Sequence, residues 1–597
     1  MKTRTKRTRP TAKRKPKADP EVKRLQALVA VARGDEPADV VLRNGSVVDV
    51  FTGETRHADI AVKDGLVAGV GRYDRAEKVI DVSGQYVAPG FIDGHIHIES
   101  SLLPVHEFCR LCLERGTTAV VADPHEIANV LGADGVRYML KASEGLPLDV
   151  FLGVPSCVPA TDVETAGARL TAADITRLLK LDRVVGLGEM MNFPGVVFGD
   201  EDVLAKLVAA RKNGMAIDGH APGVTGKWLQ AYVGAGVLSD HESVGRDEAI
   251  AKLRAGMRLM VREGSAARNM TALLPVVNEF NIRRCCLVTD DKHPEELLKE
   301  GHLDATLRKA VLNGMSPVAA IQMVTLNPAE HFGLHDRGAV APGRRADLVV
   351  LSNLERFRVR WVLKRGQPVV RDGKVLKKLP GYRDSKVTGT VKPGALGLKR
   401  FAIKAEGELC RVIRIVPDQI VTESRMMRAK VVKGQVQADP GRDLLKLAVL
   451  ERHKGTGRTG LGLVSGFGLK KGALGTTVAH DSHNIIIVGC DDKDMLKAAR
   501  ELKRIGGGYV AVANGKVAAA LKLPIAGLMS DQGAGKVAEV LGRLLRKAHA
   551  WGSRLSNPFI TLSFLALPVI PELKLTDRGL FDASRFKPVG LFTDTDE

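Results

Sequence analysis

Two histidines that stand one residue apart, His95 and His97, follow an apolar run at residues 87–92 and could hold a metal ion. On a β-strand, side chains two residues apart point to the same face, so both imidazoles can converge on one point. Neutral imidazole is the commonest metal ligand in proteins, and the end of a strand is a rigid place for it. A pair of half-exposed loop histidines would show the same spacing, so the pair alone does not decide.

The elements that would position this pair form a long alternation of short β-like and helix-like stretches, from about residue 85 to residue 335. The β-like runs lie at 85–91, 117–122, 149–154, 184–188, 215–217, 236–239, 258–261 and 284–288. Helix-like stretches with apolar residues at helical spacing include 202–213, 247–255 and 270–279. Eight such units over about 250 residues predict a parallel (β/α)8 barrel, whose active site lies at the carboxyl ends of its strands.

Ionisable residues stand at nearly every one of these strand ends. They are His95, His97, Asp123, His125, Glu126, Glu189, His220, Asp240, His241, Glu242, Glu263, Asp290 and Asp291. Alternation of strands and helices does not itself require such groups at these places, so their number favours a metal site over chance. The set contains no cysteine, which disfavours a structural site for a soft metal.

The chemistry of this set suits a pair of metal ions. Four histidines and two or three carboxylates can hold two divalent ions, with one carboxylate between them. Mixed imidazole and carboxylate ligands suit Mn²⁺, Fe²⁺ or Zn²⁺, and the sequence does not choose among these. Two such ions would generate hydroxide near neutral pH and hold it against an electrophilic carbon. Asp290, directly after the last strand, is placed to take the proton of that water, with Asp291 as the alternative.

This order of His-x-His, a central carboxylate, two single histidines and an aspartate resembles the amidohydrolase superfamily of metal-dependent hydrolases, and in detail it is similar to bacterial adenine deaminases. In the barrel the resemblance is carried by 89–101, 123–130, 186–195, 218–223, 239–243, 262–267 and 289–291. Beyond it, 327–330 and 343–349 resemble the return to a small β domain, and 479–484, 524–531 and 562–574 resemble the C-terminal domain of adenine deaminases. The resemblance covers nearly everything after about residue 25, although Gly94 stands where alanine would be expected.

The resemblance implies hydrolytic deamination of adenine to hypoxanthine and ammonia, in purine salvage or catabolism, with two divalent ions that are Mn²⁺ or Fe²⁺ before Zn²⁺. The implied metal ligands are His95, His97, Glu189, His220, His241 and Asp290. Glu189 would bridge the ions where many relatives use a carboxylated lysine, and Asp290 would also shuttle protons. The expected catalytic residues are Asp290, Glu189 and His241. The residues expected to contact the base or to orient the ligands are His125, Asp123, Glu242, Asp291 and His483.

Four segments are expected along the chain. They are a disordered basic leader at 1–25, a small β domain from 26–88 plus 336–378, the metal-dependent hydrolase barrel at 89–335, and a C-terminal α+β domain of adenine deaminase type at 379–597. The predicted fold class is therefore α/β, a TIM-like (β/α)8 barrel inserted in a small β domain, plus the C-terminal domain. In that last domain, the loop with His480 and His483 could close over the barrel mouth and shield the purine, the alternative being structural hydrogen bonding.

Composition limits the partners and the compartment. The chain has 597 residues and seven scattered cysteines, an odd number that does not suit a disulfide framework. No apolar run reaches the roughly 18 residues of a membrane span and no secretory signal is present, so we expect a cytoplasmic protein with a small-molecule substrate. Much of the net charge of +21 lies in residues 1–24, where eleven Lys and Arg oppose two acidic residues. We interpret that block as a solvated tail and not as a nucleic-acid-binding arm, and a homodimer stays open.

Two other functions are considered. A cyclic-amide hydrolase, such as a dihydropyrimidinase or hydantoinase, would use the same scaffold, but Glu189 in place of lysine and the long C-terminal domain argue against it. A non-catalytic polyanion-binding protein built around the leader would bind nucleic acid with a steep salt dependence that is lost with residues 1–24. Cytidine-deaminase-type chemistry is excluded because the H-x-E and P-C-x-x-C signature is missing.

Overall fold

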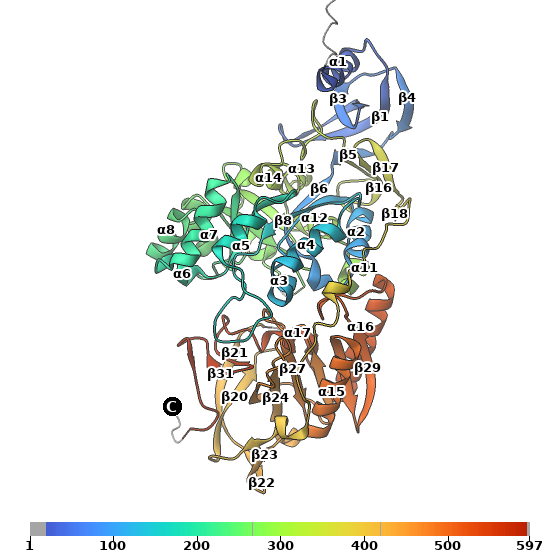
Figure 1. The fold of residues 1–597 in the computed structure, drawn as a ribbon. Coiled ribbons are helices and arrows are strands. Elements are labelled where there is room, and N and C mark those ends of the chain that lie inside the picture. Colours follow the sequence, from blue (N-terminus) through green and yellow to red (C-terminus); the bar gives the residue numbers. More distant parts are fainter. Residues whose placement is uncertain (1–18, 266, 418, 594–597) are drawn as a thin grey trace, which may run out of the picture.

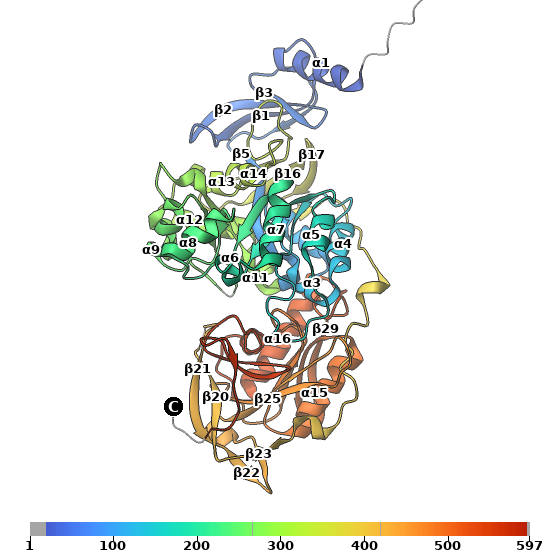
Figure 2. The ribbon, with the colours of Figure 1, turned by 60° about the vertical axis from the view of Figure 1, so that its left-hand side comes forward.

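The computed structural model describes residues 19–593, without 266 and 418, and shows three bodies in a row (Figures 1 and 2). A nine-stranded β-sheet with helix α1 lies at one end, and an α/β body lies in the middle. A domain built around an eight-stranded sheet lies at the other end. Within the described part of the chain, no helix has the length and apolar character that crossing a membrane requires.

Helix α1 (Pro20–Arg33) begins inside the segment 1–25 that is expected to be a disordered leader, so that expectation is wrong for its last residues. Residues 1–18, which hold most of the basic charge of the leader, lie outside the described residues. Asp19 caps the helix with its side chain, and the proline in the first turn has no N–H that would need a partner. Val31 is fully buried and anchors the helix against the neighbouring sheet.

The nine-stranded sheet is built from two chain segments that flank the α/β body in sequence. Its strands are β1 (Ala38–Asp49), β2 (Glu54–Lys63), β3 (Leu66–Gly71), β4 (Ala76–Asp81), β5 (Tyr86–Pro89), β15 (Leu348–Leu351), β16 (Val359–Lys364), β17 (Gln367–Arg371) and β18 (Lys374–Val375). Strand β5 pairs antiparallel with β15, with Pro89 opposite Leu348. The chain therefore enters and leaves the α/β body through neighbouring strands, in agreement with an insertion into a β domain. The boundaries of that domain stay a prediction.

Parallel strands form the α/β body. They are β6 (Phe91–His97), β7 (Thr117–Ala122), β8 (Asp149–Val154), β9 (Val184–Met190), β10 (Ala216–Gly219), β11 (Ser239–Asp240), β12 (Arg258–Arg262), β13 (Cys285–Val288) and β14 (Asp290–Asp291). One sheet has the order β10-β9-β8-β7-β6-β14 and another the order β11-β12-β13, and all their pairings are parallel. Only Thr289 separates β13 from β14, so the last strand run takes part in both sheets. Each of the eight predicted β-like runs overlaps a strand.

Helices alternate with these strands. They are α2 (Val105–Glu114), α3 (His125–Leu131), α4 (Ala133–Ala142), α5 (Ala172–Leu178), α6 (Phe193–Val197), α7 (Glu201–Lys212), α8 (Gly226–Gly234), α9 (Arg246–Arg254), α10 (Met270–Leu273), α11 (Pro294–Lys299), α12 (Leu303–Leu312), α13 (Pro317–Met323) and α14 (Leu326–His331). The predicted helices at 202–213 and 247–255 correspond to α7 and α9, but the one predicted at 270–279 is wrong beyond Leu273. Pro275 lacks a backbone N–H, and the chain passes there into a 3₁₀ turn.

The C-terminal domain combines sheets and helices. Its large sheet has the order β21-β20-β25-β24-β27-β26-β28-β29. These strands are β20 (Leu409–Ile415), β21 (Thr422–Arg428), β24 (Leu445–Leu450), β25 (Thr459–Ser465), β26 (Ala473–Thr476), β27 (Ile485–Gly489), β28 (Gly508–Ala513) and β29 (Lys516–Lys522). The helices are α15 (Asp492–Ile505), α16 (Ala534–Ala550) and α17 (Pro558–Phe564), and short strands include β30 (Leu573–Thr576). In both views α3 lies on the side of the α/β body that faces this domain (Figures 1 and 2).

Candidate metal centre

Strand ends that are far apart in sequence meet at one place in the α/β body, where His95, His97, Glu189 and Asp290 are all buried. His97 Nε2 lies 3.5 Å from Glu189 Oε1 and 3.3 Å from Asp290 Oδ1. The rings of His95 and His97 have centroids 4.9 Å apart and are nearly perpendicular. The alternation of side chains along β6 thus turns both imidazoles toward the same group of residues.

Glu189, at the end of β9, lies between two pairs of histidines. Its Oε2 is 2.7 Å from His220 Nδ1 and 3.1 Å from His241 Nε2. Its Oε1 is 3.2 Å from His125 Nδ1 and 3.5 Å from His97 Nε2. A carboxylate whose two oxygens face separate groups of imidazoles has the arrangement that a ligand between two ions requires.

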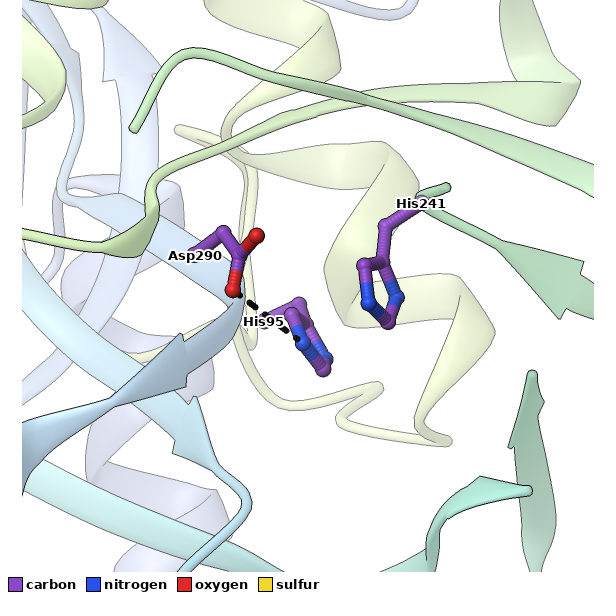
Figure 3. Close-up of side chains that lie close together, drawn as sticks. All are labelled: His95, His241 and Asp290. Carbon is purple, nitrogen blue, oxygen red and sulfur yellow. Dashed lines mark ion pairs between the residues drawn. The ribbon is translucent and has the colours of Figure 1, made fainter. Parts of the chain in front are cut away.

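Three side chains, from β6, β14 and the residue that follows β11, lie side by side in Figure 3. The rings of His95 and His241 stack with centroids 3.8 Å apart and 22° between their planes. Asp290 Oδ1 is 3.9 Å from His95 Nε2. The φ angle of Asp290 is 57°, a conformation that is rare for residues other than glycine and concentrated at functional sites. Asp290 thus adopts this rare conformation in β14, beside the rings of His95 and His241.

The donor atoms of this cluster fit divalent metal ions. Among the described residues, His95 Nε2 is buried without a hydrogen-bond partner, while Nδ1 of the same ring lies 2.9 Å from Asp218 Oδ2. An imidazole held through one nitrogen and unpartnered at the other is typical of a metal ligand. Several sets of donor atoms lie within 4.8 Å of one another, and they include His95, His97 and Glu189, then Glu189, His220 and His241, and then His95, His241 and Asp290.

The electrostatics of the cluster favour ionised carboxylates. Burial alone would raise the pKa of Glu189, but the surrounding histidines, His220 foremost, bring it well below its usual value. Burial likewise acts to raise the pKa of Asp290, and its hydrogen bond with His97 helps to bring it well below its usual value. Burial lowers the pKa of His220, but the charges of Glu242 and Glu189 outweigh burial and raise it to about 9. Metal ions would displace protons from such histidines, because ligands bind in their deprotonated form.

Two aspartates orient the candidate ligands. Asp123 Oδ2 accepts the backbone N–H of Glu189 at 2.8 Å, and the carbonyl oxygen of Asp123 lies 2.9 Å from His97 Nδ1. Asp218, on β10, instead uses its side-chain carboxylate, and its Oδ2 lies 2.9 Å from His95 Nδ1. Sequence reasoning selected Asp123 but missed Asp218, although it stands two residues before a candidate ligand at the same strand end.

Arg262 is a second residue that sequence reasoning missed. Its guanidinium pairs with both oxygens of Glu242, with 2.8 Å between Nη2 and Oε2, and its Nη1 lies 3.0 Å from Asp290 Oδ2. Glu263, which the sequence placed among the strand-end groups, instead pairs with Lys309 on α12. Because side chains alternate along a strand, a shift of one residue exchanges the group that faces the site.

Two other predicted residues take different positions. Asp240 turns to Lys252 on α9, at 2.7 Å between Oδ2 and Nζ, and so does not contribute its carboxylate to the cluster. Asp291 is half-buried and stays close, because one of its donor atoms lies within 4.8 Å of donor atoms of His97 and Asp290. The choice between Asp290 and Asp291 as proton carrier is therefore a matter for experiment.

A loop of the C-terminal domain reaches the α/β body beside this cluster. His483 Nε2 forms a hydrogen bond with Glu126 on α3, and His480 Nδ1 lies 2.5 Å from the other oxygen of that carboxylate. Glu126 adjoins His125, whose Nδ1 faces Glu189. The loop therefore contacts the α/β body beside the cluster, whereas closure over the mouth of a barrel and shielding of a purine stay predictions.

Two family models match this chain. Residues 86–376 match the model described as the amidohydrolase family, and residues 419–587 match the adenine deaminase C-terminal domain. The chain is 49% identical to the adenine deaminase of Desulfatibacillum aliphaticivorans, over 95% of this chain and 99% of that protein. It is 48% identical to the adenine deaminase of Methanothrix thermoacetophila, over 95% of this chain and 100% of that protein. A solved β-aspartyl dipeptidase from Fervidobacterium islandicum has a TM-score of 0.45 and 17% identity, and covers 57% of this chain and 99% of its own.

Proposed function

The chain belongs to the adenine deaminase family, and from this premise we propose how its residues convert adenine and water into hypoxanthine and ammonia. The two relatives are 49% and 48% identical over 95% of the chain, and the amidohydrolase family uses divalent metal ions. The protein is accordingly a hydrolytic aminohydrolase. The observation that carries the proposed chemistry is Glu189, whose two oxygens face separate pairs of histidines.

Six residues would hold two divalent ions, with Glu189 between them: His95, His97, Glu189, His220, His241 and Asp290. Nitrogen and oxygen donors without thiolate suit Mn²⁺ and Fe²⁺, with Zn²⁺ as the alternative. When bound there, such ions would lower the pKa of water and so supply hydroxide near neutral pH. The unpartnered Nε2 of His95 supports this arrangement, because a buried nitrogen without a partner needs a cation or a donor there.

Asp290 is proposed as the group that moves protons. Arg262 holds its Oδ2 at 3.0 Å, which leaves Oδ1 toward His97. Its pKa lies well below the usual value, so the side chain is ionised near neutral pH and can accept a proton from the attacking water. The oxygen of that water ends on C6 of the purine. One of its protons ends on a ring nitrogen and the other on the departing ammonia.

Glu242 and His125 are proposed to contact the purine or to orient groups that do. Glu242 Oε1 lies 3.7 Å from both His220 Nδ1 and His241 Nε2, and Arg262 holds the same carboxylate from the other side. An oriented acceptor beside the candidate ions can receive an N–H of the base. Asp123 and Asp291 would support the ligands without binding an ion themselves.

We also propose that the two parallel sheets close into one eight-stranded barrel. At one junction, beside β10 and β11, the backbone N–H of Leu238 donates to the carbonyl of Ile217 at 3.3 Å. At the other, β14 pairs with β6, with Asp290 opposite Ile96. Hydrogen bonds at both junctions support closure. Three folding units are also proposed: residues 20–88 plus 336–378, which include helix α1 and are joined by the pairing of β5 with β15, residues 89–335, and residues 379–597.

The compartment and assembly are further proposals. All seven cysteines are free, which supports a reducing compartment such as the cytoplasm. A homodimer is proposed as the assembly, and light scattering on the purified protein would measure it.

The test of the reaction is conversion of adenine by the purified protein loaded with manganese or ferrous iron. Hypoxanthine is measured by chromatography and ammonia by a coupled assay. A dihydropyrimidine and a hydantoin are offered in parallel, because ring opening of a cyclic amide is the competing reaction on this scaffold. Turnover of adenine that is lost in Glu189→Gln supports the proposal. Turnover of a cyclic amide alone, with metal bound, would reject it.

A further inference from the structure

Glu126 is the point where the C-terminal domain contacts the neighbourhood of the metal centre. Its side chain is only 3% exposed, and it lies in the first turn of α3. One carboxylate oxygen lies 2.5 Å from His480 Nδ1, and the other contacts His483 Nε2. His480 also stacks on Phe564 of α17, with ring centroids 4.7 Å apart. Both contacts to Glu126 thus come from one buried loop that its own domain holds in place.

The hydrogen of His483 has only one available position. Burial lowers the pKa of His483 to about 4, so the ring is neutral. Its Nδ1 accepts the backbone N–H of Ala479 at 3.2 Å and therefore carries a lone pair. A neutral imidazole has one N–H, which must then be Nε2–H, and this group donates to Glu126.

The same hydrogen argues against a third metal ion at this place. Donor atoms of Glu126, His480 and His483 lie within 4.8 Å of one another, as in many metal sites. Coordination through Nε2 of His483 would need a lone pair there. Because Nδ1 already accepts a hydrogen bond, the ring would then have no hydrogen at all. The trio is accordingly better described as a carboxylate held by two donors.

Glu126, which His480 and His483 hold in place, also lies beside the ring of His125. Its Oε1 lies 3.5 Å from His125 Nε2, and His125 Nδ1 lies 3.2 Å from Glu189 Oε1. Among the described residues, His125 Nδ1 is buried without a hydrogen-bond partner. His125 has a carboxylate beside each ring nitrogen; a cation bound at Glu189 would leave Nδ1 with its lone pair, while Glu126 keeps the hydrogen on Nε2, as where carboxylates orient metal-bound histidines. That lone pair then faces the carboxylate at which a cation is expected.

We propose that Glu126, His480 and His483 are positioning residues, through which the C-terminal domain orients His125 toward the metal centre. The inference rests on the proposed function for the place of the ions at Glu189. Without the donor on His483, only His480 of this loop still holds Glu126, so the carboxylate is less firmly oriented toward the ring of His125. Affinity for Mn²⁺ and kcat should fall together, while KM for adenine should change little.

The test compares His483→Gln with His483→Met in the full-length protein. The two side chains are unbranched and similar in size, but only the amide of Gln can donate an N–H to Glu126. His549→Gln and His549→Met are the matched controls, because His549 Nε2 lies 2.9 Å from the carbonyl oxygen of Leu555 within the C-terminal domain. Mn²⁺ affinity is measured by titration against a competing chelator, metal content by elemental analysis, and the manganese centre by electron paramagnetic resonance.

The expected result separates the two His483 variants. His483→Met should bind Mn²⁺ about 10- to 100-fold more weakly than the wild type and show an altered resonance spectrum, while His483→Gln stays within about threefold. Both His549 variants should match the wild type. Equal affinity and equal spectra in His483→Gln and His483→Met would overturn the proposal, and so would three manganese ions per wild-type chain. If His483→Met does not fold, His480→Asn and His480→Leu give the same comparison, because only Asn of this similarly shaped pair donates.

Affinity and spectra are measured without adenine, so they separate the positioning role from the reaction. If the wild type binds manganese and the variants His483→Met and His483→Gln differ in affinity, but the wild type does not deaminate adenine, the reaction is rejected and the positioning role is kept. Deamination by the wild type with no difference between the two variants would keep the reaction and reject the positioning role.

Discussion

The carboxylate of Asp218 lies 2.9 Å from Nδ1 of His95, which leaves the Nε2 of that ring without a hydrogen-bond partner among the described residues. The contact fixes which nitrogen carries the hydrogen and directs the other toward Asp290. Burial acts to raise the pKa of Asp218, but the hydrogen bond and charge of His95 prevail and lower it to about 2. The suitability of His95 as a ligand therefore depends on a residue outside the proposed ligand set.

Replacing Asp218 by Asn should weaken the metal centre without removing a ligand. The amide lacks the charge that holds the hydrogen on Nδ1 of His95, so we expect Mn²⁺ affinity or kcat to fall about 10- to 100-fold. Chelator competition and steady-state kinetics measure the two quantities. Asp134→Asn is the control, because Asp134 is an exposed carboxylate paired with Arg137 on the surface. Wild-type affinity in Asp218→Asn would show that this contact does not orient the ring.

Asp290 and Asp291 offer a matched pair for locating the proton carrier. Asp290→Asn should lower kcat by about 10²- to 10⁴-fold, the usual contribution of a general acid–base group. Asp291→Asn should lower it by less than about tenfold, since this side chain is expected only to support the ligands. Initial rates at saturating adenine and equal metal content give the comparison. If instead Asp291→Asn is the inactive variant, the proton carrier is Asp291.

Removal of the metal ions should destabilise the protein as well as inactivate it. A ligand that binds only the folded state stabilises it by about 2.7 kcal/mol when its concentration is a hundred times its Kd. Dialysis against a chelator should therefore lower Tm and abolish turnover, and added Mn²⁺ should restore both. Calorimetry of the apo and reloaded protein measures the change. A Tm that does not respond to Mn²⁺ would contradict binding at a buried cluster.

Stability of the C-terminal domain should depend on pH through Lys574. Burial lowers the pKa of this lysine to about 7, while its Nζ donates to the carbonyls of Ile420 and Phe564 at 2.8 and 3.1 Å. In the unfolded chain a lysine stays protonated up to a pH of about 10.4. Between these values the unfolded state binds more protons, so the free energy of unfolding should rise with pH, by about 1 kcal/mol per unit. Below about pH 7 both states are protonated and this contribution to the slope vanishes.

Lys574→Met removes the titrating group, so its stability should lack this rise. Urea unfolding of both proteins at several pH values from 7 to 10 isolates the effect, because the other titrating groups are shared and cancel in the difference. Parallel curves for the wild type and Lys574→Met would show that the lysine keeps its ordinary pKa in the folded protein.

Local patterns in the sequence are sufficient to predict the strands and much of the cluster. The period of two along β6 brings His95 and His97 to one face, and the apolar runs mark each parallel strand. His220 and Glu189 follow, because the carboxyl ends of parallel strands meet at one edge. The proposed bridging role of Glu189 rests on the family resemblance, since spacing alone does not distinguish this residue from other carboxylates.

Features that depend on tertiary contacts could not be predicted in this way. Arg262 and Glu263 are neighbours, and only the register of β12 decides which of them faces Asp290. Glu126 and His483 are 357 positions apart, and no local pattern links them. The early end of α10 at Leu273, by contrast, could have been predicted from the sequence, because Pro275 cannot donate a helical hydrogen bond.

The antiparallel pairing of β5 with β15 places Pro89 directly opposite Leu348. Opposed residues of such a pair stand only about 4.5–5.5 Å apart, so a short turn could rejoin them without the intervening chain. The α/β body is therefore an insertion between two neighbouring strands of the nine-stranded sheet. Its replacement by a short turn or by another domain would leave the strand order of that sheet unchanged.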